Sequence, residues 1–329
     1  MIDTTKLDNR WKNLFKSGKL VQVHVSKWNM SAPVQLKDLG IDISADQAKK
    51  IPGFVTLGKK TLFTDEVRLK FSRIESAARA YLLANSHKFE VADAHFVPQK
   101  ALIKVIAQLE KFKEEYYVVV KDFLDNYEKY QEEMFIAFPG HKEKLIPFYP
   151  EIAKVKDKYS FSWTTYEVSF PQNLKSVSMT EVLAQNLAVD AATKKYEAQM
   201  REQYQQHVKQ MEEFVQASAL AMRNKIVETF EVIAQKIQGK EVVNATNLKT
   251  LRNVMESFDA LDFLDDEKVR KNLAEVKKLV NSGHDFKDDK AALERLGAAI
   301  NTTLETAKTM TDVETITGGY IRRLDMSDL

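Results

Sequence analysis

The sequence predicts a mainly α-helical protein with a small β element, and three features of the 329-residue chain support this class. All seven prolines lie at or before Pro171, and because proline interrupts helices, the 158 residues that follow are expected to be almost entirely helical. Residues 178–238 contain neither glycine nor proline, and their apolar residues recur at intervals of three and four, as in a coiled coil. Residues 19–28 alternate apolar and polar side chains, which is typical of a β-strand.

Two domains and a tail are predicted from this pattern. Residues 1–171 are expected to form a mixed α+β domain with two long helices and short strands, residues 172–312 a helical, coiled-coil-like domain, and residues 313–329 a flexible tail. The expected elements of the first domain are a strand over 19–28, a short helix between Ser44 and Pro52, a helix beginning after Thr64, a second long helix from Pro98 to Phe135, and one or two strands within 158–171 that pair with the first strand.

One very long helix, over residues 178–238, dominates the predicted C-terminal half. Gly239 is expected to end it, and three shorter helices follow, near Asn247, over 265–281 and over 289–309. Its apolar stripe packs either against these shorter helices or against another chain, including a second copy of the protein, because helical hairpins and dimers share this pattern. The stripe is the candidate partner surface and contains Tyr196, Met200, Tyr204, Val208, Met211 and Val215.

Residues 53–61, GFVTLGKKT, come close to a Walker A phosphate loop. Such a loop needs small residues around the phosphates and, directly after its lysine, a hydroxyl that binds Mg²⁺. Here Lys60 follows Lys59, the hydroxyl comes one residue late at Thr61, and the loop interior is bulky and apolar. We therefore expect a turn or short hairpin around Gly58, with the apolar residues inward and both lysines outward, and no bound cofactor.

Metal and catalytic motifs are absent from the sequence. The chain has no cysteine, and its six histidines form no HExxH motif. His87 and His95 flank an acidic stretch, which we interpret as a loop with surface histidines in preference to a metal site. The carboxylate runs 262–267 and 285–289 both precede predicted helices, where carboxylates cap the amino ends. No catalytic, metal or cofactor-binding residue is predicted, and the chain is expected not to be an enzyme; a catalytic pair from distant segments is the alternative.

The N-terminal segment is basic. Residues 1–60 hold 11 basic and 5 acidic residues, a net charge of +6, whereas the remainder holds 38 basic and 42 acidic residues, a net charge of −4. The candidate contacts to nucleic-acid phosphates are Lys12, Lys16, Lys19 and Lys27. A solvated basic face is the alternative interpretation. The aromatic residues of 112–149 follow a helical spacing, which favours core packing over a stacking surface for single-stranded nucleic acid.

The expected location of the protein is the cytoplasm, without membrane contact. No run approaches about 18 apolar residues, and the first residues lack the apolar region of a signal peptide. The absence of cysteine also fits a reducing compartment.

A family resemblance rests on four stretches taken in order: VSKWNMSAPVQLKDLGI, LGKKTLF, VRLKFSRIESAARAYLLANS and FVPQ. In order and spacing they resemble the DUF3150 family of bacterial and phage proteins. The resemblance implies a helical C-terminal half and a structural role for LGKKTLF, and it supplies neither an activity nor site residues. It also implies a genomic context, because genes of this family often lie in phages and mobile elements beside a MoxR- or CobS-like AAA+ ATPase and a von Willebrand A-type protein.

Three functions are therefore considered. The first is a non-enzymatic interaction or adaptor protein of a phage or mobile element, which partners the AAA+ ATPase or the von Willebrand A-type protein and is able to form a homo-oligomer through its long helix. The second is nucleic-acid binding by the basic N-terminal segment. The third is a purely structural component of a phage or assembly.

Overall fold

The computed structural model describes the chain except for residues 1–3, 35–57, 90–92, 141, 169–186, 284–285, 287–288 and 327–329. At residues 4–8, 187–198, 200–201, 204, 310–311 and 325–326 it describes the backbone alone. The described chain is mainly helical with small antiparallel sheets, which confirms the predicted class.

Two compact units make up the structure, and they do not follow the predicted boundary at residue 171. Unit 1 contains Met1–Val21, Leu83–Ile103 and Thr165–Leu329, and unit 2 contains Gln22–Leu82 and Lys104–Thr164. The chain thus changes unit after residues 21, 82, 103 and 164. The predicted division failed because proline and glycine mark the ends of elements but carry no information on which distant segments share a core.

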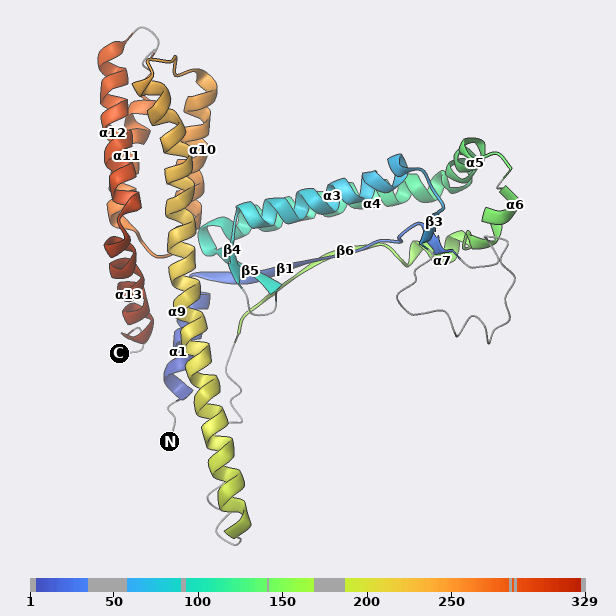
Figure 1. Cartoon of the computed structure of the whole chain (residues 1–329), viewed down its shortest axis with the longest axis horizontal. Coiled ribbons are helices and arrows are strands. Elements are labelled where there is room, and N and C mark those ends of the chain that lie inside the picture. Colours follow the sequence, from blue (N-terminus) through green and yellow to red (C-terminus); the bar gives the residue numbers. More distant parts are fainter. Residues whose placement is uncertain are drawn as a thin grey trace. The chain divides into compact units, whose positions relative to one another are not determined.

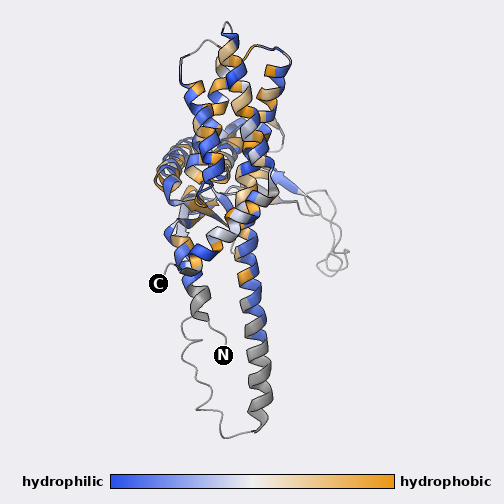
Figure 2. Cartoon of the chain, turned by 90° about the vertical axis from the view of Figure 1, so that its left-hand side faces the viewer, coloured by the Kyte–Doolittle hydropathy of each residue, from blue (hydrophilic) through white to orange (hydrophobic). Residues whose placement is uncertain are grey.

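The long helix α9 (Leu187–Gln238) is the centre of unit 1 (Figure 1). It packs against α1 (Thr4–Lys16), α10 (Ala245–Leu261), α12 (Lys290–Lys308) and α13 (Met310–Met326), while α11 (Glu267–Val280) packs against α10 and α12. Figure 2 shows hydrophobic and hydrophilic residues interspersed along these helices, as expected where each helix buries one face. The predicted helix 178–238 is confirmed from Leu187 onward, and residues 178–186 lie outside the described residues.

The three shorter C-terminal helices begin where the sequence predicts. The Asn244 side chain accepts from the Asn247 backbone at the start of α10, Asp266 accepts from the Val269 backbone in α11, and Asp289 caps α12 in the same way. The interpretation of the carboxylate runs as helix caps is confirmed for Asp266 and Asp289.

The predicted tail is wrong, because the chain continues as helix α13 up to Met326. Tyr320 and Leu324 of this helix are buried. The Leu324 carbonyl oxygen accepts a hydrogen bond from Asn13 Nδ2 at 2.9 Å, and the Tyr320 hydroxyl lies 3.0 Å from the Ser17 hydroxyl. The last helix is therefore held by Asn13 of α1 and by Ser17 just after α1, both more than 300 positions away in sequence. The sequence pattern did not predict α1.

A four-stranded sheet has the order β4-β5-β1-β6. Strand β1 (Gly18–Ser26) confirms the predicted strand, and β6 (Ser160–Tyr166) lies beside it, as expected for the stretch 158–171. In unit 1, β1 pairs antiparallel with β5 (Ala94–Pro98), and β4 (His87–Phe89) pairs antiparallel with β5. The stretch 87–95, predicted to be a surface loop, thus consists largely of two strands, and Pro98 ends a strand in place of starting a helix.

Unit 2 is built on two long helices with short elements at their ends. Helix α3 (Asp65–Ala84) begins directly after Thr64, as predicted. The predicted helix 98–135 is divided into α4 (Gln99–Asp125) and α5 (Tyr127–Ala137), because Asn126 leaves the helical conformation and its Nδ2 donates to the Asp122 carbonyl oxygen. The remaining elements are β2 (Ser31–Pro33), β3 (Lys59–Thr61), α6 (Lys142–Leu145), the 3₁₀ helix η3 (Ile146–Phe148) and α7 (Ile152–Lys156).

Aromatic side chains fill the core of unit 2. Phe63 contacts the rings of Phe123 and Tyr127, and Phe71 contacts the rings of Tyr116 and Phe123, with ring centroids 5.2–5.8 Å apart. All five side chains are buried. The predicted core packing of residues 112–149 is confirmed for Tyr116, Phe123 and Tyr127. The short helix predicted between Ser44 and Pro52 lies outside the described residues.

Candidate functional site

The apolar stripe of α9, predicted to be a partner surface, is internal in its described part. Met211 and Val215 are buried in the core of unit 1, and Val208 packs against that core. Met211 and Val215 are therefore not available to another chain, because the helices packed against α9 cover them, while Val208 is partly buried. Tyr196, Met200 and Tyr204 lie within the helix, and their side chains are outside the described residues.

The four lysines proposed as nucleic-acid contacts belong to two different units. Lys12 and Lys16 are exposed on α1, and Lys19 forms an ion pair with Glu167, all in unit 1. Lys27 belongs to unit 2, where its Nζ lies 2.8 Å from Glu75 and donates to the Ser72 hydroxyl at 3.0 Å. The basic N-terminal segment is thus divided between the two units, and the contact of these lysines with nucleic acid stays a prediction.

Lys27 lines an open pocket of about 480 Å³ in unit 2. We call it the basic pocket, and it is lined by Ser26, Lys27, Trp28, Asn29, Ser31, Pro33, Lys59 and Lys158. Three of these eight residues are cationic and none is acidic. The volume lies within the range of small-molecule binding sites, roughly 300–1,000 Å³.

Local hydrogen bonds hold the walls of the basic pocket. Strands β2 and β3 pair antiparallel, which places Lys59 opposite Pro33. The Ser26 hydroxyl donates to the Lys158 carbonyl oxygen at 3.2 Å, and the Ser26 carbonyl oxygen accepts a bond of 2.6 Å from the buried Tyr116 hydroxyl. Three segments that are distant in sequence therefore meet here in a defined geometry.

A strained residue lies in the same wall. Met30 has a φ angle of 51°, in the left-handed region that residues other than glycine rarely adopt, and its side chain is buried. Such a conformation costs on the order of 1 kcal/mol and persists where surrounding contacts enforce it. Here Leu62 donates its backbone N–H to the Met30 carbonyl oxygen at 2.9 Å, and the turn presents Asn29 and Ser31, on either side, to the basic pocket.

Of the three lysines of the basic pocket, only Lys27 has a carboxylate partner among the described residues. Burial alone would raise the pKa of Glu75, but hydrogen bonds and charges from Lys27 and Arg79 lower it below its ordinary value. Glu75 is therefore ionised and balances Lys27. Lys59 and Lys158 are exposed, and within the described chain their ammonium groups have no hydrogen-bond or ion-pair partner.

Lys60, the second lysine of the Walker-like stretch 53–61, does not have the exposed, outward position that the sequence predicted. Gly58 has a φ angle of 81°, which suits the predicted turn, and β3 follows it directly. Lys60 is half-buried, with its Nζ 3.5 Å from the centroid of the Phe148 ring. It is therefore held by an aromatic face, while Lys59 is exposed as predicted. Residues 53–57 lie outside the described chain.

Large apolar side chains are exposed at α5 and at the segment leading to α7. We call this set the α5–α7 apolar surface; it consists of Ile136, Phe138, Ile146 and Ile152, which are 72%, 52%, 50% and 46% exposed. Two contacts connect the segments that carry it: the Phe135 and Tyr149 rings lie 5.7 Å apart, and the Tyr127 hydroxyl donates to the Pro150 carbonyl oxygen.

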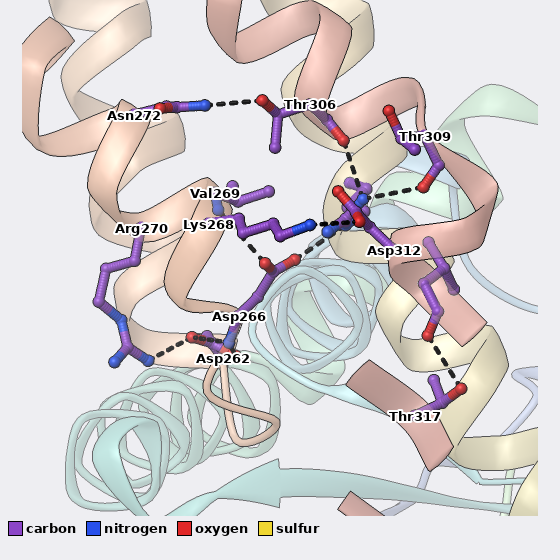
Figure 3. A network of polar contacts seen from close by, with 12 residues as sticks. Asp262, Asp266, Lys268, Val269, Arg270, Asn272, Thr306, Thr309, Asp312 and Thr317 are labelled. Atoms are coloured by element: carbon purple, nitrogen blue, oxygen red, sulfur yellow. Dashed lines mark hydrogen bonds and ion pairs between the residues drawn. The ribbon is translucent and has the colours of Figure 1, made fainter. Parts of the chain in front are cut away.

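A buried polar network connects three helices of unit 1 (Figure 3). Arg223 of α9 is almost fully buried; its Nε lies 2.8 Å from Asp266, and its Nη1 donates to the carbonyl oxygens of Thr306 and Thr309. Arg223 thus binds both the amino end of α11 and the carboxyl end of α12, where the helix dipole favours a cation. The Arg223 Nη2 atom is buried without a hydrogen-bond partner among the described residues. The contacts of Nε and Nη1 are all to the protein itself, so we assign the network a structural role.

The two histidines that were predicted to be exposed are not. His87 is 5% exposed, and its Nε2 lies 3.1 Å from the Leu261 carbonyl oxygen, to which it donates because a carbonyl oxygen can only accept. Burial lowers its pKa to about 4. His95 is half-buried, 3.0 Å from the Ser86 hydroxyl. The described residues contain no group of three or more histidine or carboxylate side chains arranged to hold a metal ion.

Sequence reasoning missed most of the basic pocket. It selected Lys27 and noted Lys59, and Trp28 lies in the first of the four stretches that carry the family resemblance, but the sequence assigned Trp28 no role. Lys158 belongs to none of these stretches. Only the pairing of β2 with β3 and the bond between Ser26 and Lys158 bring these residues together.

A membrane-spanning helix would need about 18 or more apolar residues, and none of the helices among the described residues meets this requirement.

Comparison with known proteins identifies a family. A family model, DUF3150, described as a protein of unknown function, matches residues 16–226, which is more than half of the chain. No curated protein and no solved structure matches.

Proposed function

The chain belongs to the DUF3150 family, and on this basis we propose that it is a non-enzymatic interaction protein that binds an AAA+ ATPase of the MoxR or CobS type through the α5–α7 apolar surface. The ATPase is proposed because genes of the family often lie beside one. The α5–α7 apolar surface is the observation that carries the proposal.

Burial energetics support a partner at this surface. Single exposed apolar residues are ordinary, but a group of large ones marks an interaction site, because covering apolar surface contributes roughly 25 cal/mol per Å². The described part of the α9 stripe is internal, so an adaptor needs a different surface. Unit 2 exposes four large aliphatic or aromatic side chains within 17 residues of chain, and we take these as that surface.

The test is a binding measurement between the full chain and the purified ATPase encoded beside its gene, after nuclease treatment of both. The surface variant is Ile136→Ser with Phe138→Ser. The matched control is Ile103→Ser with Val118→Ser, which removes two side chains of α4 that are 80% and 68% exposed. We expect the surface variant to lose at least about tenfold in affinity, the scale of an interface hot spot, and the control to bind like the wild type.

Two outcomes contradict the proposal in different ways. Equal affinity of the surface variant and the control would exclude the α5–α7 apolar surface as the binding site. Absence of binding by the wild type would exclude the ATPase as the partner. A second copy of the chain is the other occupant to consider, and sedimentation velocity of the wild type and the surface variant would detect it.

A further inference from the structure

The basic pocket has a chemistry that the proposed interaction with an ATPase does not use. The geometry points to a binding site for a nucleotide phosphate, in which Lys59 and Lys158 hold the phosphate and Trp28 contacts the base. The ligand class is a nucleotide, either free or as part of a single strand of nucleic acid.

The cations of the basic pocket define the charge of the ligand. Lys59 lines the pocket from the start of β3, and Lys158 lines it from a position two residues after the end of α7. Lys27 adds a third ammonium group, whose charge Glu75 balances. Two ammonium groups without a described partner, in a lining that has no carboxylate, match the charge of one phosphate group.

The neutral lining residues supply the remaining contacts. The Asn29 side chain offers an amide donor and the Ser31 side chain a hydroxyl, and both are able to bind phosphate or sugar oxygens. Met30 lies between Asn29 and Ser31, and its unfavourable left-handed backbone conformation holds both residues at the pocket. A strained backbone at a pocket is typical of a binding site.

Trp28 distinguishes a nucleotide from a simple anion. Its ring is half-buried and is held edge-on by the buried Phe63 ring, with centroids 5.6 Å apart and an angle of 79° between the planes. Because Trp28 also lines the basic pocket, a fixed aromatic surface lies beside the cations. Cations beside an aromatic surface form the usual arrangement for binding single-stranded nucleic acid, in which the base stacks and the phosphate is neutralised.

An acidic peptide is the competing ligand class, since carboxylates also bind lysine. The cations of the lining are all lysines, which bind phosphate and carboxylate alike as point charges, so Trp28 has to separate the two classes. An acidic peptide leaves the Trp28 surface without a partner. The nucleotide is therefore the ligand that uses both halves of the pocket.

The test is a titration of the full chain with a short fluorescent oligothymidylate and, separately, with thymidine monophosphate by calorimetry. The pocket variant is Lys59→Ala with Lys158→Ala. The matched control is Lys129→Ala with Lys156→Ala, which removes two exposed lysines of the same unit that do not line the basic pocket. All four lysines are exposed, so neither variant is expected to change folding, and circular dichroism checks this.

We expect the pocket variant to lose at least about tenfold in affinity, the scale of one charge-assisted hydrogen bond. The slope of log affinity against log salt concentration should become less negative by about 0.7 for each lost phosphate contact. Trp28→Leu should also weaken binding by about tenfold, because stacking on the ring is lost. The control should keep the affinity of the wild type.

The two ligands separate the two sources of nucleotide. Loss of oligothymidylate binding in the pocket variant, with no binding of the monophosphate to any protein, supports a nucleic-acid strand. If the wild type binds thymidine monophosphate and the pocket variant does not, the result supports a free nucleotide as the ligand. Equal losses in the pocket variant and the control, or failure of the wild type to bind either ligand, would overturn the inference, as would binding of polyglutamate in place of both nucleotides.

Discussion

At the scale of single residues, burial changes the chemistry that residue type suggests. His87 lies in a stretch rich in charged residues, yet its ring contacts Phe263 and is almost fully buried in unit 1. Desolvation lowers its pKa from 6.5 to about 4, and the positive charge of Lys225 lowers it further, while the hydrogen bond to the Leu261 carbonyl oxygen opposes the shift. Such a histidine is neutral in the folded protein at neutral pH.

His87 makes the stability of unit 1 depend on pH. Between pH 6.5 and about 4 the unfolded chain binds a proton at this histidine and the folded chain does not. Its contribution is therefore fully present above pH 6.5 and is lost as the pH falls, by about 2 kcal/mol at pH 5. Urea unfolding at pH 7.5 and pH 5 should show a smaller pH dependence for His87→Gln than for the wild type.

The matched control for this measurement is His24→Gln, since His24 is exposed. This control should keep the pH dependence of the wild type. The pKa of His95 is also lowered by burial, but His95 is present in all three proteins and its effect cancels. A His87→Gln protein with the same pH dependence as the wild type would contradict the assignment.

At the scale of secondary-structure elements, helix ends depend on both local and distant groups. The caps Asn244, Asp266 and Asp289 are local, and the sequence indicates all three regions. The carboxyl end of α12 is different, because Arg223, more than 80 residues earlier, binds its carbonyl oxygens. No sequence pattern connects these positions.

Removal of the Arg223 charge should destabilise unit 1 strongly. Arg223→Met leaves Asp266 buried without its cation, and breaking one side of a buried ion pair costs about 3–5 kcal/mol. Lys268→Met is the control, because Lys268 is 66% exposed in its pair with Asp312 and such pairs contribute about 1 kcal/mol or less. Chemical denaturation measures both.

A second substitution identifies the cause of this loss. Asp266→Asn in the Arg223→Met background removes the uncompensated charge and keeps an acceptor for the Val269 backbone, so it should recover part of the stability. A loss for Arg223→Met no larger than that for Lys268→Met would show that the buried network is not a stabilising connection between α9, α11 and α12.

At the scale of the whole molecule, the core of unit 1 is assembled from three separate segments of chain. Phe214 contacts the rings of Phe89 and Phe96, and Phe263 contacts Phe96, so the C-terminal helices depend on the hairpin of β4 and β5. Trp11 belongs to the same buried cluster. A division of the chain at residue 171 therefore removes part of the core.

A fragment of residues 172–329 should consequently fail to fold as an independent domain. Without the first two segments of unit 1, Phe214 and Phe263 lose their aromatic neighbours and become exposed. We expect the fragment to bind a hydrophobic dye, to lack near-ultraviolet circular dichroism and to unfold without cooperativity. The control is to mix the fragment with residues 1–171. The mixture should lose the dye binding and regain near-ultraviolet circular dichroism and cooperative unfolding. Cooperative unfolding of the isolated fragment, without dye binding, would contradict the interleaved core.

The order of amino acids alone is sufficient for the helical class, the positions of most helices, the central strand β1 and the helix caps, because these depend on hydrogen bonds and side chains a few residues apart. Tertiary structure alone decides that Met211 and Val215 are internal, that α13 is ordered by α1, that His87 is buried, and that Lys59, Lys158 and Trp28 share a pocket. Each of these depends on contacts between residues far apart in the chain, and a local pattern carries no information on which distant segments meet.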